Sequence, residues 1–256
     1  MKLVCAGITD VGCARDHNED DFYLSDGDDA LCVVADGMGG HRSGEVASAM
    51  AIKAIVEYYR ETIPDSSEPA PDRVADDVAI SRDEKRLVES IKMANTAVFR
   101  AAGESEIYRG MGTTIVSALF REDCAYLAHI GDSRAYRLRA GEVVQQTDDH
   151  SLANEYVRMG ILAKEDVEHF PYKNVITRAC GLTDDVEVEV TRADVQPGDV
   201  FILCSDGLTD MVSDPDILTI ANENDDLNVL CQELVRLANE NGGADNITVI
   251  IARVEE

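Results

Sequence analysis

The sequence predicts an α+β protein whose sheets are mainly antiparallel, and two patterns lead to that fold class. Short apolar runs of strand length recur along the chain, and some are separated only by turns such as "REDC" and "RAGE", which are typical of hairpins rather than of helical crossovers. Other segments repeat their apolar residues at helical spacing. The predicted strands cover Leu3–Ile8, Leu31–Ala35, Thr113–Phe120, Ala125–Ile130, Ala135–Arg139, Val200–Cys204 and Ile247–Val254.

The predicted helices lie on either side of this strand-rich middle. The first follows a glycine-rich stretch, and Ser43 is its candidate N-cap. Each helix places its apolar residues on one face, as expected for a helix that packs on a sheet. These faces are Val46, Ala47, Met50, Ala51, Ala54, Ile55 and Tyr58 in the first helix, Leu87, Ile91, Ala94 and Val98 in the second, and Leu230, Leu234, Leu237 and Ala238 in the third.

Two stretches lack a clear period. Glu61–Lys85 is rich in proline and acidic residues, and we expect a solvated excursion without a chemical role. Residues 147–181 lie between well-formed strands and carry their own short helix at Ser151–Met159. We expect this second stretch to be a subdomain mounted on the core of a single domain that spans residues 1–256.

Composition narrows the class of protein. The chain has 256 residues, of which 45% are hydrophobic and 29% charged, as in globular proteins of one large or two small domains. It has no apolar stretch of about 18 residues, and an aspartate interrupts the start "MKLVCAGITDVG", so we expect neither a membrane span nor a signal peptide but a cytoplasmic protein. The net charge of -27 disfavours nucleic-acid binding, although an acidic surface that serves only solubility would look the same.

The cysteines do not indicate a disulfide framework or a zinc site. Seven are scattered along the chain, none in a C-x-x-C spacing, and most lie in apolar runs. We expect buried, reduced thiols.

The acidic residues fall at informative places. Asp36, Asp132 and Asp206 end apolar runs, Asp245 precedes another, and Glu19 and Asp20 stand where a further strand begins. A single aspartate of this kind usually caps a turn. Several carboxylates gathered at strand ends would repel one another unless cations neutralised them, and oxygen ligands without cysteine or histidine suit Mg²⁺ or Mn²⁺. Such ions, about 4 Å apart, are the usual means of activating water against a phosphoester.

The glycine-rich stretch "DGMGGHRSGEVAS" is not a nucleotide cradle. Gly39 and Gly44 have the spacing of a phosphate-binding loop, but Glu45 and Val46 stand where lysine and serine or threonine are required. We instead interpret Asp36 and Gly37 as a metal-binding pair, with the backbone carbonyl of the glycine as an added ligand. A histidine close to such a turn more often orders the loop, and this is how we interpret His41 and, further along, His150.

Seven segments together resemble the metal-dependent protein phosphatases of type 2C, in particular their compact bacterial members. They occur in the family's order and span nearly the whole chain. These segments are "RDHNEDDF", "VVADGMGGHRSGEVAS", "MGTTIVSALF", "LAHIGDSRAYRLRAGEVVQQTDDHSL", "NVITRACG", "GDVFILCSDGLTDMV" and "ADNITVIIARV".

The resemblance implies a four-layer α-β-β-α sandwich, two antiparallel sheets flanked by helices, in which residues 147–181 form the flap. It implies hydrolysis of phosphoserine and phosphothreonine in proteins by direct attack of a metal-activated water. The expected cofactors are two Mn²⁺ or Mg²⁺ ions with a third, weaker one. Phosphoproteins are the expected substrates. A serine/threonine kinase that acts on the same substrates is the expected counterpart. We expect a monomer that binds neither nucleic acid nor membrane.

The resemblance also implies roles for individual residues. Asp36 resembles the ligand that bridges the two metals, and Gly37 adds its carbonyl. Asp206 and Asp245 resemble ligands of one metal, and Asp132 joins Asp206 at the third. Three groups of further residues are implied to assist: Glu19 and Asp20 hold metal-bound waters, Arg15 grips the substrate phosphate, and Asn246 supports the site by hydrogen bonding.

One position departs from the eukaryotic members, and two other functions stay open. Met38 stands where those members have a histidine proposed as general acid, so the leaving-group proton must come from another group. A phosphatase-like regulator without activity is the first alternative. Such inactive members should have lost metal-binding aspartates, whereas Asp36, Asp132, Asp206 and Asp245 are all present in this sequence. A metal-dependent nuclease or nucleotide hydrolase is the second, and it fits the acidic charge poorly.

Overall fold

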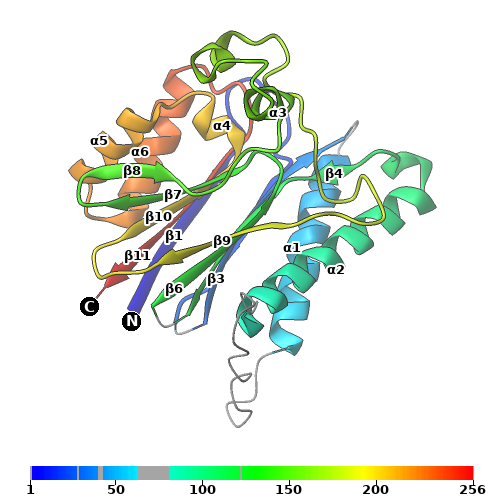
Figure 1. Cartoon of the computed structure of the whole chain (residues 1–256), viewed down its shortest axis with the longest axis horizontal. Coiled ribbons are helices and arrows are strands. Elements are labelled where there is room, and N and C mark those ends of the chain that lie inside the picture. Colours follow the sequence, from blue (N-terminus) through cyan, green and yellow to red (C-terminus); the bar gives the residue numbers. More distant parts are fainter. Residues whose placement is uncertain (1, 28, 40–42, 63–80, 122, 256) are drawn as a thin grey trace.

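Two antiparallel sheets lie face to face, with helices covering both outer sides, in the computed structural model of the chain (Figure 1). The structure describes residues 2–27, 29–39, 43–62, 81–121 and 123–255. The first sheet has the strand order β1 (Lys2–Asp10), β11 (Ile247–Glu255), β10 (Val200–Cys204), β7 (Arg134–Arg139) and β8 (Glu142–Gln145). The second has the order β2 (Asp20–Leu24), β3 (Ala30–Met38), β5 (Ile115–Arg121), β6 (Cys124–Ile130) and β9 (Glu189–Asp194), and β4 (Gly112–Thr113) pairs with the end of β3.

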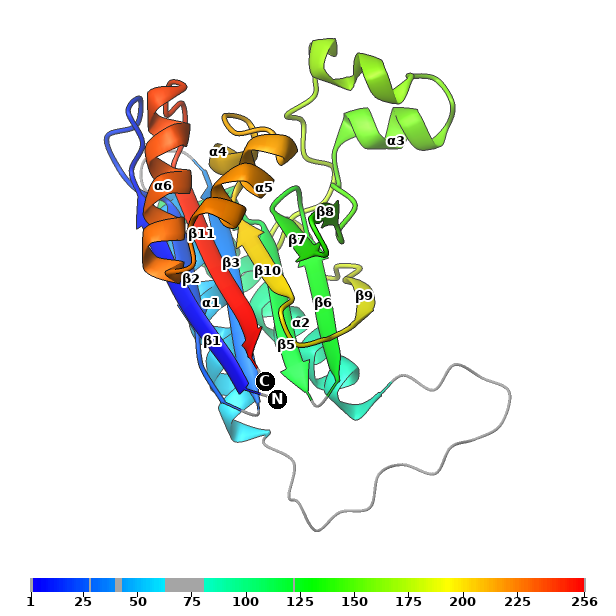
Figure 2. The same cartoon turned by 90° about the vertical axis from the view of Figure 1, so that its left-hand side faces the viewer.

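The helices form the outer layers. One side is covered by α1 (Ser43–Glu61) and α2 (Arg82–Glu104), which is followed by the short 3₁₀ helix η1 (Glu106–Tyr108). The other side carries α4 (Asp206–Thr209), α5 (Asp214–Glu223) and α6 (Leu227–Glu240). The helix α3 (Leu152–Arg158) and the 3₁₀ helix η2 (Lys164–His169) project from one end of the sandwich, opposite the two termini (Figure 2).

Three apolar cores hold these layers together, because strand residues alternate between the two faces of each sheet. One core lies between the sheets, where Phe120 meets Phe201 edge to face at a centroid distance of 5.1 Å. A second lies beneath α1 and α2 and includes Ile55 and Leu87. A third joins the first sheet to α4, α5 and α6. Within the described residues, no helix combines the length and the hydropathy needed to cross a bilayer.

The predicted fold class is confirmed, and so are the two hairpins: Arg121 pairs with Cys124 and Arg139 with Glu142. Several predicted boundaries are wrong. The strand expected to end before Asp36 runs on to Met38, and the strand expected over Thr113–Phe120 is divided at Thr114 into β4 and β5. The hairpin at "RAGE" implied β8 without giving its bounds, and the predictions missed β9, α4 and α5 altogether.

The helical predictions hold with small shifts. Ser43, expected as N-cap, is the first residue of α1 itself. Most of the predicted excursion, residues 63–80, lies outside the described residues, but its last residues belong to α2, which Ser81 caps by accepting a hydrogen bond from the Glu84 amide. The predicted helix in residues 147–181 has its caps at Ser151 and Met159, the two residues named from the sequence.

All seven cysteines lie among the described residues and are free thiols, as predicted. Burial holds for Cys32, Cys180, Cys204 and Cys231, but Cys13 is exposed and Cys5 and Cys124 are only partly covered. The apolar interior is therefore the environment of four of the seven thiols.

Candidate metal centre

The fold brings the predicted acidic residues to one end of the sandwich. Asp20, at the start of β2, is the register partner of Asp36 in β3. Asp206 begins α4 directly after β10, and Asp245 lies just before β11, the strand that pairs with β10. The helix α4 lies at the end from which α3 projects, so this cluster faces the segment predicted to be a flap (Figure 2).

Electrostatics shows that these carboxyl groups form one cluster. The pKa of Asp36 lies well above its ordinary value because the group is buried and because Asp20, Asp206, Asp132 and Asp245, in that order of effect, repel its charge. Burial is likewise the main reason that the pKa of Asp20 and of Asp132 rises to about 7 and that of Asp206 to about 6. Charged carboxylates at such a site need a neutralising partner.

Carboxylate oxygens without hydrogen-bond donors indicate which kind of partner neutralises the cluster. One carboxylate oxygen each of Asp20, Asp132 and Asp206 is buried and accepts no hydrogen bond. The second oxygen of Asp20 accepts hydrogen bonds from the hydroxyls of Ser205 at 2.8 Å and Thr248 at 2.7 Å, which fixes the side chain. These three unpaired atoms are carboxylate oxygens, the kind of ligand that hard divalent cations such as Mg²⁺ or Mn²⁺ prefer.

Glycines allow the backbone to crowd around Asp36. The Gly37 amide donates to the Glu19 carbonyl at 3.1 Å, and a Cβ on Gly37 would lie only 2.1 Å from the Gly44 carbonyl oxygen. No side chain fits there, so the turn predicted from the glycine-rich stretch packs against the loop before β2. The Gly44 amide, at the start of α1, donates to the Glu19 carboxylate and opposes the rise in pKa that burial imposes on Glu19.

Asn246 holds the rim of the cluster together, and its predicted hydrogen-bonding role is confirmed. Its side-chain oxygen accepts from the Glu19 amide at 2.7 Å, and its side-chain nitrogen donates to the carbonyls of Val11 and His17, each at 2.9 Å. One amide group therefore fixes the whole loop between β1 and β2. This loop carries Arg15, whose guanidinium donates to the Asp245 carboxylate at 2.6 Å.

Asp132 lies on the side of the cluster that faces residues 147–181. It contributes, with Asp206, to the lining of a small cavity of about 70 Å³ that also includes Lys173 and Asn174. Both of these residues contact Asp210, one helical turn after Asp206, at 3.4 and 3.2 Å. The segment predicted to be a flap therefore touches the element that carries Asp206.

Two further residues were singled out from the sequence. Met38 is the partly buried last residue of β3. His41 lies outside the described residues.

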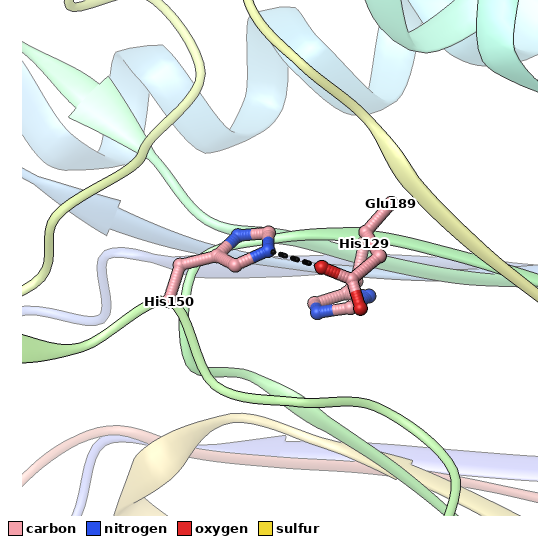
Figure 3. A group of neighbouring side chains, drawn as sticks. All are labelled: His129, His150 and Glu189. Carbon is pink, nitrogen blue, oxygen red and sulfur yellow. Dashed lines mark hydrogen bonds and ion pairs between the residues drawn. The ribbon is translucent and has the colours of Figure 1, made fainter. Parts of the chain in front are cut away.

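Sequence reasoning missed a second group beside the cluster. His129, His150 and Glu189 each place one potential ligand atom within 4.8 Å of the others (Figure 3). The two imidazole rings are stacked, with centroids 4.6 Å apart and planes inclined by only 16°. A metal ion lies in the plane of each imidazole that binds it, and two stacked, nearly parallel rings share no such point, so this arrangement is not that of a metal site. No spacing in the sequence signals the group, because its members come from β6, the loop after β8, and β9.

Fold and site together define a class of protein: a four-layer sandwich with a cluster of carboxyl groups at one end. Residues 14–249 match the family model described as protein phosphatase 2C, and the chain belongs to that family.

Relatives and solved structures of this family match the chain over nearly its whole length. The serine/threonine phosphatase stp of Listeria innocua is 36% identical over 95% of this chain and 92% of its own length. The protein phosphatase PhpP of Streptococcus pneumoniae is 36% identical over 97% and 96%. The crystal structure of the Mycobacterium tuberculosis serine/threonine phosphatase PstP/Ppp matches with a TM-score of 0.85 at 34% identity, covering 100% of both chains. A structure of the PstP catalytic domain in complex with two manganese ions matches with a TM-score of 0.82 at 34% identity, over 100% of this chain and 99% of that one.

Proposed function

We propose that the protein is a metal-dependent phosphatase that hydrolyses phosphoserine and phosphothreonine in proteins by direct attack of water. The observation that carries this proposal is the carboxylate cluster, in which Asp36 lies among four other aspartates and three of these have a buried oxygen without a donor. The relatives named as serine/threonine phosphatases, and the structural relative with two manganese ions, support the same activity and cofactor.

Each acidic residue has a proposed place in a centre for two Mn²⁺ or Mg²⁺ ions. Asp36 would bridge the ions, and the Gly37 carbonyl, held by the close packing of its backbone, would add a ligand. Asp206 and Asp245 would hold one ion, and Asp132 with Asp206 would hold a third, weaker one. Glu19 and Asp20 would accept hydrogen bonds from bound waters. When bound, the ions lower the pKa of a water molecule and offset the charge of the phosphoryl oxygens.

Arg15 is the proposed phosphate-binding residue. Its side chain is 49% exposed, and its guanidinium already lies against Asp245, at the rim of the cluster. From this position the planar group can donate two parallel hydrogen bonds to a phosphate. It would hold the phosphoryl group while charge builds on the oxygens in the transition state.

Two of the buried cysteines are unfavourable as covalent nucleophiles. Burial raises the pKa of Cys180 and Cys204 to about 12, so neither is a thiolate near neutral pH. Direct attack by water needs no such nucleophile.

The domain organisation, cellular location and partners are proposed from the same family membership. Residues 1–256 form one catalytic domain, with residues 147–181 as its flap. We place the enzyme in the cytoplasm as a monomer that takes part in signalling and reverses the action of a serine/threonine kinase on the same substrates. Its ions are either Mn²⁺ or Mg²⁺. The acidic net charge of -27 argues against a nucleic-acid partner.

A substrate panel tests the activity. The purified protein would be given Mn²⁺ together with a phosphothreonine peptide, the matching phosphotyrosine peptide, single-stranded DNA, RNA and nucleoside triphosphates. Release of phosphate from the phosphothreonine peptide, well above release from the others, is expected. Hydrolysis of a nucleic acid or nucleotide instead would favour the nuclease alternative. A folded protein inactive on every substrate with Mn²⁺ or Mg²⁺ would favour the regulator that only binds a partner.

A further inference from the structure

We propose that His150 is a positioning residue that fixes the backbone beside Asp132 and ties both ends of residues 147–181 to it. The inference rests on the proposed function, because Asp132 matters only if it binds the third ion. It gives a structural reason for the histidine that the sequence singled out at the start of the predicted flap.

The first step is the double contact between His150 and Gly131. The Gly131 amide donates to the His150 Nδ1 atom at 3.0 Å, and the His150 amide donates to the Gly131 carbonyl at 2.9 Å. Gly131 has a φ of +106°, and a Cβ there would lie 2.7 Å from the Thr114 side chain. Both polar groups of the residue next to Asp132 are thus held by one partner, in a backbone conformation that favours glycine.

The second step is the contact of the same residue with the predicted flap. The His150 carbonyl accepts a hydrogen bond from the Thr177 amide at 2.8 Å, where the chain returns to the sandwich. The ring of His129 stacks on His150, and its Nε2 atom lies 2.8 Å from the Asp148 carbonyl, where the chain leaves. His150 therefore joins the departing chain, the returning chain and the Asp132 loop.

The third step is the tautomer of the ring. Because Nδ1 accepts the Gly131 amide, the proton of a neutral His150 resides on Nε2, which donates to Glu189 at 3.2 Å (Figure 3). Arg178 lies 3.3 Å from Nε2 and cannot donate to a protonated nitrogen; it also pairs with Glu187 at 3.4 Å. A charged ring would turn an N–H toward the Gly131 N–H. Burial, followed by the charge of His129, lowers the pKa of His150 to about 4, so the neutral form prevails.

Two substitutions separate the contacts of this ring. In His150→Asn, the amide oxygen can take the place of Nδ1 and still accept the Gly131 amide. In His150→Gln, the amide reaches the place of Nε2 and leaves Gly131 without its acceptor. Asp132→Asn serves as the reference that lacks the proposed ligand. The measurement is Mn²⁺ binding by calorimetry and by the electron spin resonance of free Mn²⁺, together with kcat and KM for a phosphothreonine peptide.

We expect His150→Gln to weaken the same class of Mn²⁺ sites that Asp132→Asn weakens, by about 10- to 100-fold, the usual effect of removing a residue that orients a ligand. The tighter sites should be unchanged, and KM for the peptide should rise. His150→Asn should keep Mn²⁺ affinity near wild type. Equal losses in both variants, or no loss in His150→Gln, would overturn the inference.

A measurement on the unaltered protein covers the case in which a variant does not fold. Hydrogen exchange of the Gly131 amide should be slow, since the amide is bonded to a buried ring. Fast exchange at Gly131 in a folded protein would contradict the proposed contact. A wild type without any metal-dependent activity would instead refute the proposed function, so the two failures are distinguishable.

Discussion

Asp20 offers a quantitative test of the claim that the carboxylate cluster destabilises the protein when metal is removed. Its pKa rises from the ordinary 3.8 to about 7, mainly through burial. An acid with a raised pKa in the folded state gives up stability as the pH increases, because folding then requires burial of the charged form. The penalty is absent below pH 3.8 and complete above about pH 7, where the difference in pKa corresponds to about 4 kcal/mol.

Asp20→Asn should remove this penalty with little other change. The asparagine oxygen can accept from Ser205 and Thr248 as the carboxylate does, and its amide group would face the remaining carboxylates. Urea unfolding in the presence of a chelator should show the variant more stable than wild type by about 2 kcal/mol at pH 5 and about 4 kcal/mol at pH 8.

The matched control is Asp185→Asn, an exposed position far from the cluster in the chain, where no change is expected. Saturating Mn²⁺ should favour wild type over Asp20→Asn, since metal binding stabilises the folded state. If Asp20→Asn were no more stable than wild type at pH 8 in chelator, the penalty inferred for burying the charged Asp20 would be wrong.

The remaining predictions concern single residues around the site. Arg15→Ala should raise KM for a phosphothreonine peptide about 10-fold with a smaller change in kcat, since a charged hydrogen bond to phosphate is lost; an unaltered KM in steady-state kinetics would remove Arg15 from the phosphate site. Asn246→Ala should lower the urea-unfolding free energy by about 1–3 kcal/mol, because the Glu19 amide and two carbonyls lose their partner, and an unchanged value would contradict this role. Asp36→Asn should abolish measurable turnover while circular dichroism stays native; retained activity at high Mn²⁺ would exclude the bridging role.

Much of this fold could be predicted because the buried strands are nearly pure apolar runs. Strands such as β10 and β11 lie in the middle of a sheet, covered on both faces, and their sequences leave no other interpretation. β9 was missed because it is an edge strand whose sequence, EVTRAD, has one valine among charged residues, and it is only partly buried. α5 was missed although Ser213 and Pro215 are an ordinary helix start, since no long apolar face follows.

The acidic residues of the site could be predicted from the sequence, but the hydrogen bonds and ring contacts that hold the site together could not. Aspartates directly after apolar runs are visible in the sequence, and the strand order places them together. The sequence cannot show that Asp20 would bond to Ser205 and Thr248, because those contacts join residues more than 180 positions apart. His129 sits within an apolar run, and only the packing of β6 against the loop after β8 shows that it stacks on His150.

The central claim is that the cluster binds metal ions that make phosphoester hydrolysis by water possible. Its most direct test is hydrolysis of a phosphothreonine peptide while Mn²⁺ is titrated, with wild type beside Asp206→Asn. We predict activity that rises from zero with Mn²⁺ in wild type and is absent in the variant at every concentration, with both proteins folded. Wild-type activity in the presence of chelator, or Asp206→Asn activity equal to wild type at saturating Mn²⁺, would contradict the proposed mechanism.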